Sequence, residues 1–220
     1  MSEKRPSSPA EPTLVYGFDP ICGWCFGFRT AVASLRKSLA GRVRWRVACG
    51  GLVTGERITP IAQTREYLER GMVMVEAGTD ARFGEGFTKG LLAHGTWVST
   101  SEPGCRAVLL VQSLEGSDKA LDFGDELSRA FYGEGRPTDD VDSLERVAKK
   151  TKVDARRLLE AWSAPGAEHQ TWQAFSKARA EGVISYPSMF LDRGRGLEPV
   201  VSGCLPADEA LARIERSLAS

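Results

Sequence analysis

Residues 13–18 (TLVYGF) constrain this chain more than any other segment, because no polar side chain follows the first residue of the run. A short apolar run of β-branched and aromatic residues is typical of a strand that is covered on both faces. The run ends at Asp19-Pro20, a pair that favours a turn. We therefore expect a central strand near the N-terminus, with further structure packed on both faces of its sheet.

A helix and a second strand are predicted next. Apolar residues recur at helical spacing after Cys25 until Gly41, at Phe28, Val32, Leu35 and Leu39. Residues 43–48 (VRWRVA) then alternate between apolar and more polar side chains, and the pattern ends at Gly50-Gly51. This order predicts a βαβ unit with two parallel strands and a right-handed crossover.

The long stretch of residues 50–185 shows helical patterns and no convincing strand. Apolar stripes predict helices around residues 108–114, 123–131, 141–147, 155–162 and 172–179. Strand patterns return at residues 188–191 and 199–202, and a last helix begins around Pro206. We expect a disordered tail at residues 1–12, a βαβ-ββα domain from residues 13–51 and 183–220, and an all-helical insertion at residues 52–182.

Charge and hydropathy exclude several classes of protein. Lys and Arg total 29, as do Asp and Glu, so the chain lacks the basic excess that nucleic acid or an anionic membrane attracts. The longest apolar run, residues 107–111, is far shorter than the roughly 20 residues that span a bilayer. The first dozen residues contain no apolar segment of a secretory signal, and we expect a cytoplasmic protein.

The motif Cys22-Gly23-Trp24-Cys25 lies where the first predicted strand gives way to the first helix. The unpaired N–H groups and the dipole at a helix start favour an anion, and the thiolate is the reactive form of cysteine. Thiols three positions apart face the same side of a helical turn and can close a disulfide. We expect Cys22 to be exposed and Cys25 to be shielded by the turn.

Two other interpretations of this cysteine pair stay open from the residues alone. Such a pair is also half of a structural zinc site, but the remaining candidate ligands stand alone in the sequence: Cys49, Cys105, Cys204, His94 and His169. The pair can also be inert core residues. The neighbouring Asp-Pro and Gly-Trp pairs argue against that, because they are typical of a turn.

Four motifs, taken in this order, are similar to those of the DsbA family of the thioredoxin superfamily. They are FDPICGWCFGF at residues 18–28, GGL at residues 50–52, SEPGCRAV at residues 101–108 and GVISYPSMFLD at residues 182–192. Together they resemble the cytoplasmic FrnE-type branch over nearly the whole chain after the tail. The resemblance implies an α/β, thioredoxin-like fold (βαβ-ββα) with a long all-helical insertion.

The resemblance also implies roles for individual residues. Cys22 is expected to be the attacking thiol and Cys25 the resolving thiol, with Pro187 as a cis-proline against the dithiol. Tyr186 would offer backbone groups to an extended substrate, and Trp24 is its companion in substrate binding. A trans proline that opens a strand is the alternative for Pro187.

The implied activity is that of a thiol-disulfide oxidoreductase or disulfide isomerase, which needs no metal or organic cofactor. Its partners would be proteins or small molecules that carry a thiol or disulfide, and the direction of electron flow and the oligomeric state stay open. One alternative is a glutathione-dependent transferase or isomerase of the kappa or hydroxychromene-carboxylate type, although those relatives typically carry one Ser in place of the dithiol. The other is a non-catalytic binding protein that uses the same cleft.

The sequence supports expectations for four more residues. Asp19, three positions before Cys22, either caps the turn or accepts a proton, and the sequence favours the cap. Cys204 follows the last predicted strand, whose end should lie at the same edge of the sheet as the dithiol, so we expect Cys204 near Cys22. His94 and His169 have no partner motif, and we interpret them as ordinary histidines.

Overall fold

The computed structural model describes residues 11–220. The predicted tail at residues 1–12 therefore lies, except for its last two positions, outside the described residues. The division into a domain of residues 13–51 and 183–220 and an insertion of residues 52–182 stays a prediction.

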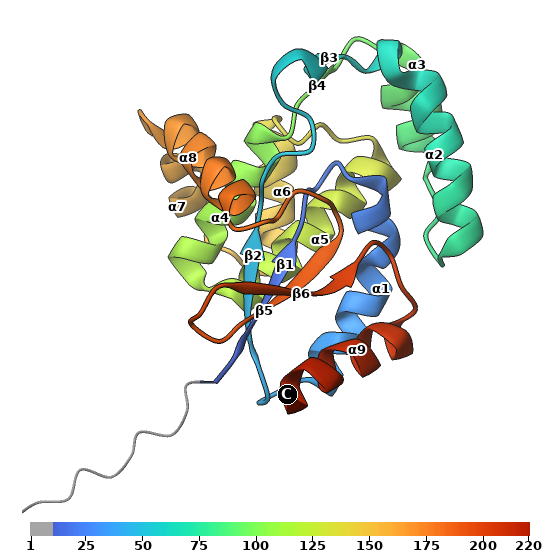
Figure 1. Ribbon diagram of the computed structural model, residues 1–220. Helices are drawn as coiled ribbons and strands as arrows, with labels where there is room; N and C mark the ends of the chain where they lie inside the picture. Colours follow the sequence, from blue (N-terminus) through green and yellow to red (C-terminus); the bar gives the residue numbers. More distant parts are fainter. Residues whose placement is uncertain (1–10) are drawn as a thin grey trace, which may run out of the picture.

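A four-stranded sheet forms the centre of the molecule (Figure 1). Its strands are β1 (Thr13–Gly17), β2 (Arg44–Ala48), β5 (Ser188–Asp192) and β6 (Leu197–Ser202), in the order β2-β1-β5-β6. β1 runs parallel to β2 and antiparallel to β5, and β6 runs antiparallel to β5. The predicted parallel pair and the predicted hairpin are both confirmed, and β1 is an inner strand as its apolar run requires.

Both faces of this sheet are covered. Leu14 and Tyr16 belong to the main core cluster, which includes Phe28 of helix α1 (Gly23–Ser38) and Ile214 of helix α9 (Ala207–Ala219). Val15 faces the other way and packs in a smaller cluster, because side chains alternate along a strand. Its partners there include Phe190, Val183 and Ala178.

Most of the chain between β2 and β5 is helical. The longer helices are α2 (Arg65–Gly78), α4 (Glu102–Glu115), α5 (Ser117–Glu134), α6 (Val141–Thr151), α7 (Ala155–Trp162) and α8 (Ala167–Ala180). Short helical turns lie at Gly55–Arg57, Ile61–Thr64 and Gly86–Leu91, and the last of them continues into the short helix α3 (Leu92–His94). Helices α4 to α8 confirm the five predicted apolar stripes, and the Asp154 side chain caps α7 by accepting a hydrogen bond from the Arg157 N–H at 3.0 Å.

The expectation of an all-helical insertion is wrong in one place. Strands β3 (Thr59–Pro60) and β4 (Val98–Ser99) form a small antiparallel ribbon. Next to it the Ile61 N–H donates to the Trp97 carbonyl at 2.8 Å. Two-residue strands leave no alternation in a sequence, so a pattern search cannot detect them. The same search also missed α2, which lies beside α1 (Figure 1).

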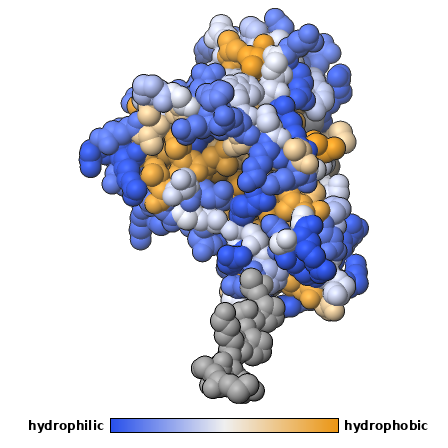
Figure 2. Space-filling model, turned by 60° about the vertical axis from the view of Figure 1, so that its left-hand side comes forward, coloured by the Kyte–Doolittle hydropathy of each residue, from blue (hydrophilic) through white to orange (hydrophobic). Residues whose placement is uncertain are grey.

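The face turned forward in Figure 2 is mostly hydrophilic, with separate apolar patches between hydrophilic residues. The large apolar side chains that are exposed include Tyr67, Val73 and Met74 of α2, and Ile184 just before β5. Among residues 11–220, no helix has both the length and the apolar character that a bilayer crossing requires.

Candidate active site

The cysteine pair lies at the first turn of α1, as its position in the sequence predicts. Cys22 is the N-cap residue, and its N–H donates to the Asp19 carbonyl at 3.1 Å. The Phe26 N–H closes the first helical turn on the Cys22 carbonyl at 3.0 Å. Cys22 and Cys25 are both free thiols, and a disulfide between them would join the N-cap to the first turn of the helix.

The loop before β5 meets this turn. The Cys22 Sγ donates to the backbone carbonyl of Tyr186 at 3.5 Å, and the Tyr186-Pro187 peptide bond is cis. The Pro187 carbonyl in turn accepts the Gly203 N–H at 2.9 Å. Segments from three distant parts of the chain therefore meet at one edge of the sheet.

The expectation that Cys22 is exposed is wrong, because only 4% of the residue is accessible, compared with 1% for Cys25. Side chains from the helical segment between β2 and β5 cover the start of α1. A Cβ on Gly23 would lie within 4 Å of Phe83, Tyr132 and Val75. Cys22 is still the more accessible of the two cysteines.

The surroundings of Cys25 favour its neutral form. Burial raises the pKa of Cys25 well above its usual range, and the contact with Cys22 and the charge of Cys22 raise it further. Burial likewise raises the pKa of Tyr16 on β1, as do the charges that Cys25 and Cys22 would carry. Cys25 is thus held as a neutral thiol behind Cys22.

Asp19 holds the turn before the motif together. Its carboxylate accepts the Ile21 N–H at 3.1 Å and the Leu52 N–H at 2.8 Å, and the Cys105 thiol lies 3.6 Å away. Burial raises the pKa of this carboxyl, although the hydrogen bonds from Leu52, Ser101 and Ile21 oppose the shift. The capping interpretation fits this geometry, since both oxygens receive backbone N–H groups.

The GGL and SEPG motifs converge on the same place. The Ser101 hydroxyl accepts the Val53 N–H at 2.8 Å, one residue after the Leu52 N–H that binds Asp19. Gly50 leaves space for the Tyr186 hydroxyl, with which a Cβ at this position would collide. Gly51 has a φ of +73°, a left-handed conformation that favours glycine. These glycines bring the chain after β2 close to the dithiol.

Helix α5 contributes two residues that sequence reasoning missed. The Ser128 hydroxyl donates to the Pro20 carbonyl at 2.9 Å, and the Tyr132 hydroxyl donates to the Ile21 carbonyl. Residues four apart lie on the same face of a helix, so one face of α5 binds two consecutive carbonyls. The only signal in the sequence is a pair of hydroxyls four positions apart in an otherwise apolar stripe.

The remaining candidates differ in their distance from the dithiol. Trp24 is partly buried and packs against both large core clusters. Cys204 is partly exposed, and burial raises its pKa together with the charge of Cys22, which supports the expected proximity. The His94 ring bonds the Gly90 carbonyl and the His169 ring bonds Gln173, both on exposed helix surfaces. Within residues 11–220 no three potential metal ligands cluster.

The fold and the position of the cysteine pair can be compared with those of known proteins. The sequence matches no protein-family model and no curated protein. The structure is similar to that of a proposed protein disulfide isomerase from Nitrosomonas europaea, with a TM-score of 0.82, 22% identity and coverage of 95% of this chain and 98% of that one.

It is also similar to the cytosolic disulfide reductase DsbM from Pseudomonas aeruginosa, with a TM-score of 0.77, 24% identity and coverage of 94% and 98%. A second structure of that protein contains GSH. The oxidoreductase DsbA from Xylella fastidiosa matches with a TM-score of 0.56 and 15% identity over 97% of this chain and 88% of that one. The chain therefore has the thioredoxin-like fold of DsbA-type oxidoreductases, with the cysteine pair at the start of the first helix.

Proposed function

We propose that this protein is a thiol-disulfide oxidoreductase that works through Cys22 and Cys25. The observation that carries the proposal is the contact between the Cys22 thiol and the Tyr186 carbonyl at 3.5 Å, with Cys25 buried one turn behind. This contact puts a nucleophile beside a strand end that offers backbone groups to an incoming chain. Trp24 and Tyr186 are the proposed substrate-binding residues, and Pro187 fixes the path of that loop.

The reaction proceeds in two exchanges. The Cys22 thiolate attacks one sulfur of a substrate disulfide, the substrate bond breaks, and the other substrate sulfur leaves as a thiolate that takes up a proton. Cys25 then loses its proton and attacks the Cys22 sulfur of the mixed disulfide. The bond from Cys22 to the substrate breaks, so the substrate leaves reduced by two electrons and the protein holds a Cys22-Cys25 disulfide. The reverse sequence oxidises a substrate dithiol.

Disulfide isomerisation is the second proposed activity of the same dithiol. It uses the first exchange alone, followed by attack of another substrate thiol on the mixed disulfide. The similarity to a proposed protein disulfide isomerase supports this second activity. The similarity to a cytosolic disulfide reductase, solved also with GSH, supports small thiols as reductants and a cytoplasmic location. The motifs at residues 18–28 and 182–192 support membership of the FrnE-type branch.

The proposal is tested by trapping. Cys25→Ser should leave the first attack intact and remove resolution, so a disulfide substrate should accumulate as an adduct of Cys22 on a non-reducing gel. Cys22→Ser should form no adduct, and Cys204→Ser, which alters a nearby thiol outside the pair, should behave like the wild type. An adduct through Cys25 in the Cys22 variant, or none in either, would overturn the assignment.

Three further measurements determine the direction of electron flow and distinguish the alternative functions. Equilibration with glutathione redox buffers, followed by thiol alkylation, gives the reduction potential of the pair, and a strongly reducing value favours a reductase. Conjugation or isomerisation of a small apolar substrate that persists in a Cys22→Ser, Cys25→Ser double variant would favour a glutathione-dependent enzyme. Partner binding that is unchanged in that variant, without exchange by the wild type, would favour a binding protein.

A further inference from the structure

A cavity borders Cys25, and neither Cys22 nor Tyr186 is among the residues that line it. Its volume is about 90 Å³, and its walls come from β1, β2, α1 and α5. Most of the lining is apolar, including Phe18, Val32 and Val47. Since a water molecule needs roughly 10–15 Å³ of such space, this cavity has room for several.

Six polar side chains line this space: those of Tyr16, Cys25, Arg29, Arg36, Asp125 and Ser128. The Nε of Arg29 is buried and has no hydrogen-bond partner within residues 11–220. In the same part of the chain, no hydrogen bond or ion pair ends on the Asp125 carboxylate. A buried N–H and a carboxylate that stay unpaired beside one cavity are the partners that ordered water requires.

The groups around Asp125 set its charge. Burial raises its pKa, and so do Glu126 and Asp122, while Arg29 and Arg129 lower it. The charge of Asp125 also raises the pKa of Tyr16, which in turn contacts Cys25. Asp125 and Cys25 therefore each lie close enough to Tyr16 to shift its pKa.

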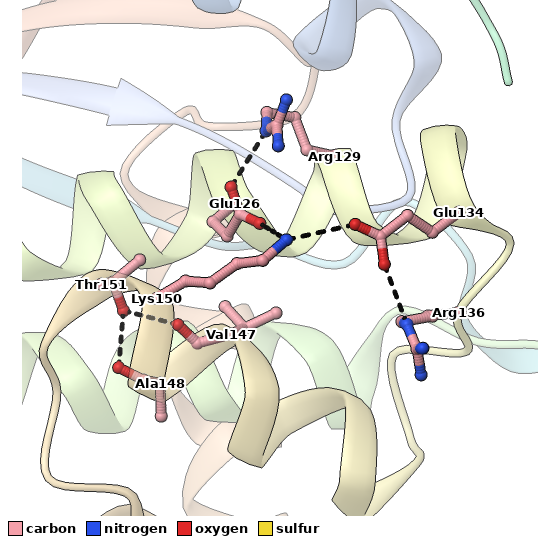
Figure 3. Close-up of polar contacts among 8 residues, drawn as sticks. All are labelled: Glu126, Arg129, Glu134, Arg136, Val147, Ala148, Lys150 and Thr151. Atoms are coloured by element: carbon pink, nitrogen blue, oxygen red, sulfur yellow. Dashed lines mark hydrogen bonds and ion pairs between the residues drawn. The ribbon is translucent and has the colours of Figure 1, made fainter.

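The other charged side chains near the cavity form ion pairs with partners outside it. Glu126 binds Arg129 and Lys150 of α6, as Figure 3 shows. Burial raises the pKa of Glu126, but these hydrogen bonds outweigh burial and lower it. Arg36, at the cavity wall, pairs with Asp118 and Asp122 at 3.3 and 2.6 Å. Asp125 is thus the carboxylate of this region that is left facing the cavity.

The resolving step requires a proton acceptor for Cys25, and this cavity can provide access to one. Cys25 must lose its proton to attack the mixed disulfide, and at that moment the bound substrate covers the Cys22 side. Asp19 is a poor acceptor because backbone N–H groups already occupy both of its oxygens, and it does not line the cavity. A carboxylate with a raised pKa and free oxygens is better suited to the task.

We propose that this cavity holds a short water chain through which Cys25 exchanges its proton with the Asp125 carboxylate during resolution. The inference rests on the thiol-disulfide exchange proposed above. The Cys25 proton passes through water, beside the Tyr16 hydroxyl, to the carboxylate. The thiolate that remains attacks the Cys22 sulfur and the substrate sulfur leaves with the electron pair. In the reverse direction Cys25 leaves as a thiolate and recovers the proton from Asp125.

The test separates the two exchanges with 5,5′-dithiobis(2-nitrobenzoate), which releases one coloured thiolate when Cys22 attacks and a second when Cys25 resolves the adduct. All variants carry Cys204→Ser to silence the partly exposed thiol. Near pH 7, Asp125→Asn should leave the first phase unchanged and slow the second about tenfold or more. The difference should shrink toward alkaline pH, where hydroxide removes the proton, and Asp125→Glu should recover much of the rate.

The matched control is Asp118→Asn, an exposed carboxylate on the same helix that does not line the cavity, and both phases should match the wild type. Equal second phases in Asp125→Asn and wild type across pH 6.5–9 would overturn the inference. So would a slow second phase in Asp19→Asn with a normal one in Asp125→Asn, or a defect that Asp125→Glu does not relieve. A first phase that survives Cys22→Ser would instead contradict the proposed function itself.

Discussion

The Tyr132 hydroxyl donates a hydrogen bond to the backbone carbonyl of Ile21, the residue directly before Cys22. The donor belongs to α5, and the acceptor belongs to the turn between β1 and α1. Both residues are buried, so the bond is protected from competition by water. The position of Cys22 is thus fixed partly by a residue that lies 111 positions from Ile21 in the sequence.

Removing this bond should destabilise the protein. We expect Tyr132→Phe to lower the free energy of unfolding by about 1–3 kcal/mol, because the Ile21 carbonyl stays buried without its donor. Denaturation by urea measures the change. Tyr67→Phe is the matched control, since Tyr67 is 71% exposed and its loss should cost no more than about 0.5 kcal/mol. Equal losses in the two variants would contradict the role of the bond.

Gly50 should be intolerant of a side chain. A Cβ at this position collides with the Tyr186 hydroxyl and lies 3.0 Å from the Val183 carbonyl. We expect Gly50→Ala to displace the Tyr186 loop, to cost about 1–3 kcal/mol of stability, and to slow attack by Cys22. Gly71→Ala serves as the control, because Gly71 lies in α2 with open space around it and alanine there should be neutral or stabilising. An unchanged attack rate in Gly50→Ala would refute the prediction.

The ionisation of Asp19 predicts a pH dependence of stability. Its pKa is raised by burial, so the folded protein holds this proton more tightly than the unfolded chain, which releases it at about pH 3.9. The stabilisation from this group is complete below that pH and is lost as the pH rises through the raised pKa. The difference in unfolding free energy between wild type and Asp19→Asn should therefore fall with pH. A difference that is constant or rises, measured by urea denaturation from acid to neutral pH, would contradict the shift.

The two thiols should differ in reactivity with iodoacetamide. In a Cys22→Ser variant, Cys25 should react about tenfold or more slowly than an unhindered cysteine at neutral pH, because it is buried and its pKa is raised. Its rate should increase only at a pH above the usual thiol range of about 8.5. In a Cys25→Ser variant, Cys22 should react faster than Cys25 does in the Cys22→Ser variant. Mass spectrometry of the modified peptides gives both rates, and faster labelling of Cys25 than of Cys22 would reverse the proposed roles.

Much of the sheet could be predicted from the sequence because its signals are local. The apolar run at residues 13–18 marks β1, and the alternation at residues 43–48 marks β2. Turn residues around the cysteine motif place it at the start of α1. Each of these features depends on a few neighbouring side chains, which a pattern records directly.

The surroundings of the site could not be predicted in the same way. The side chains beside Gly23, next to Cys22, are those of Phe83, Val75 and Tyr132, which lie far away in sequence and meet only in the folded chain. The unpaired groups of Arg29 and Asp125 are likewise ordinary charged residues in the sequence, on two different helices. Such contacts depend on tertiary packing, for which one sequence carries no periodic signal.

The place of β1 between β2 and β5 has a consequence for how the chain folds as it is synthesised. β1 can pair with β2 once the first helix has formed, but its other neighbour, β5, leaves the ribosome only after the whole helical segment. Until then one edge of β1 presents unpaired backbone groups, the kind of edge that invites pairing with other chains. Contacts of such large sequence separation also form slowly. A nascent chain stalled before Ser188 should therefore be prone to aggregation, whereas the released full-length protein closes that edge itself.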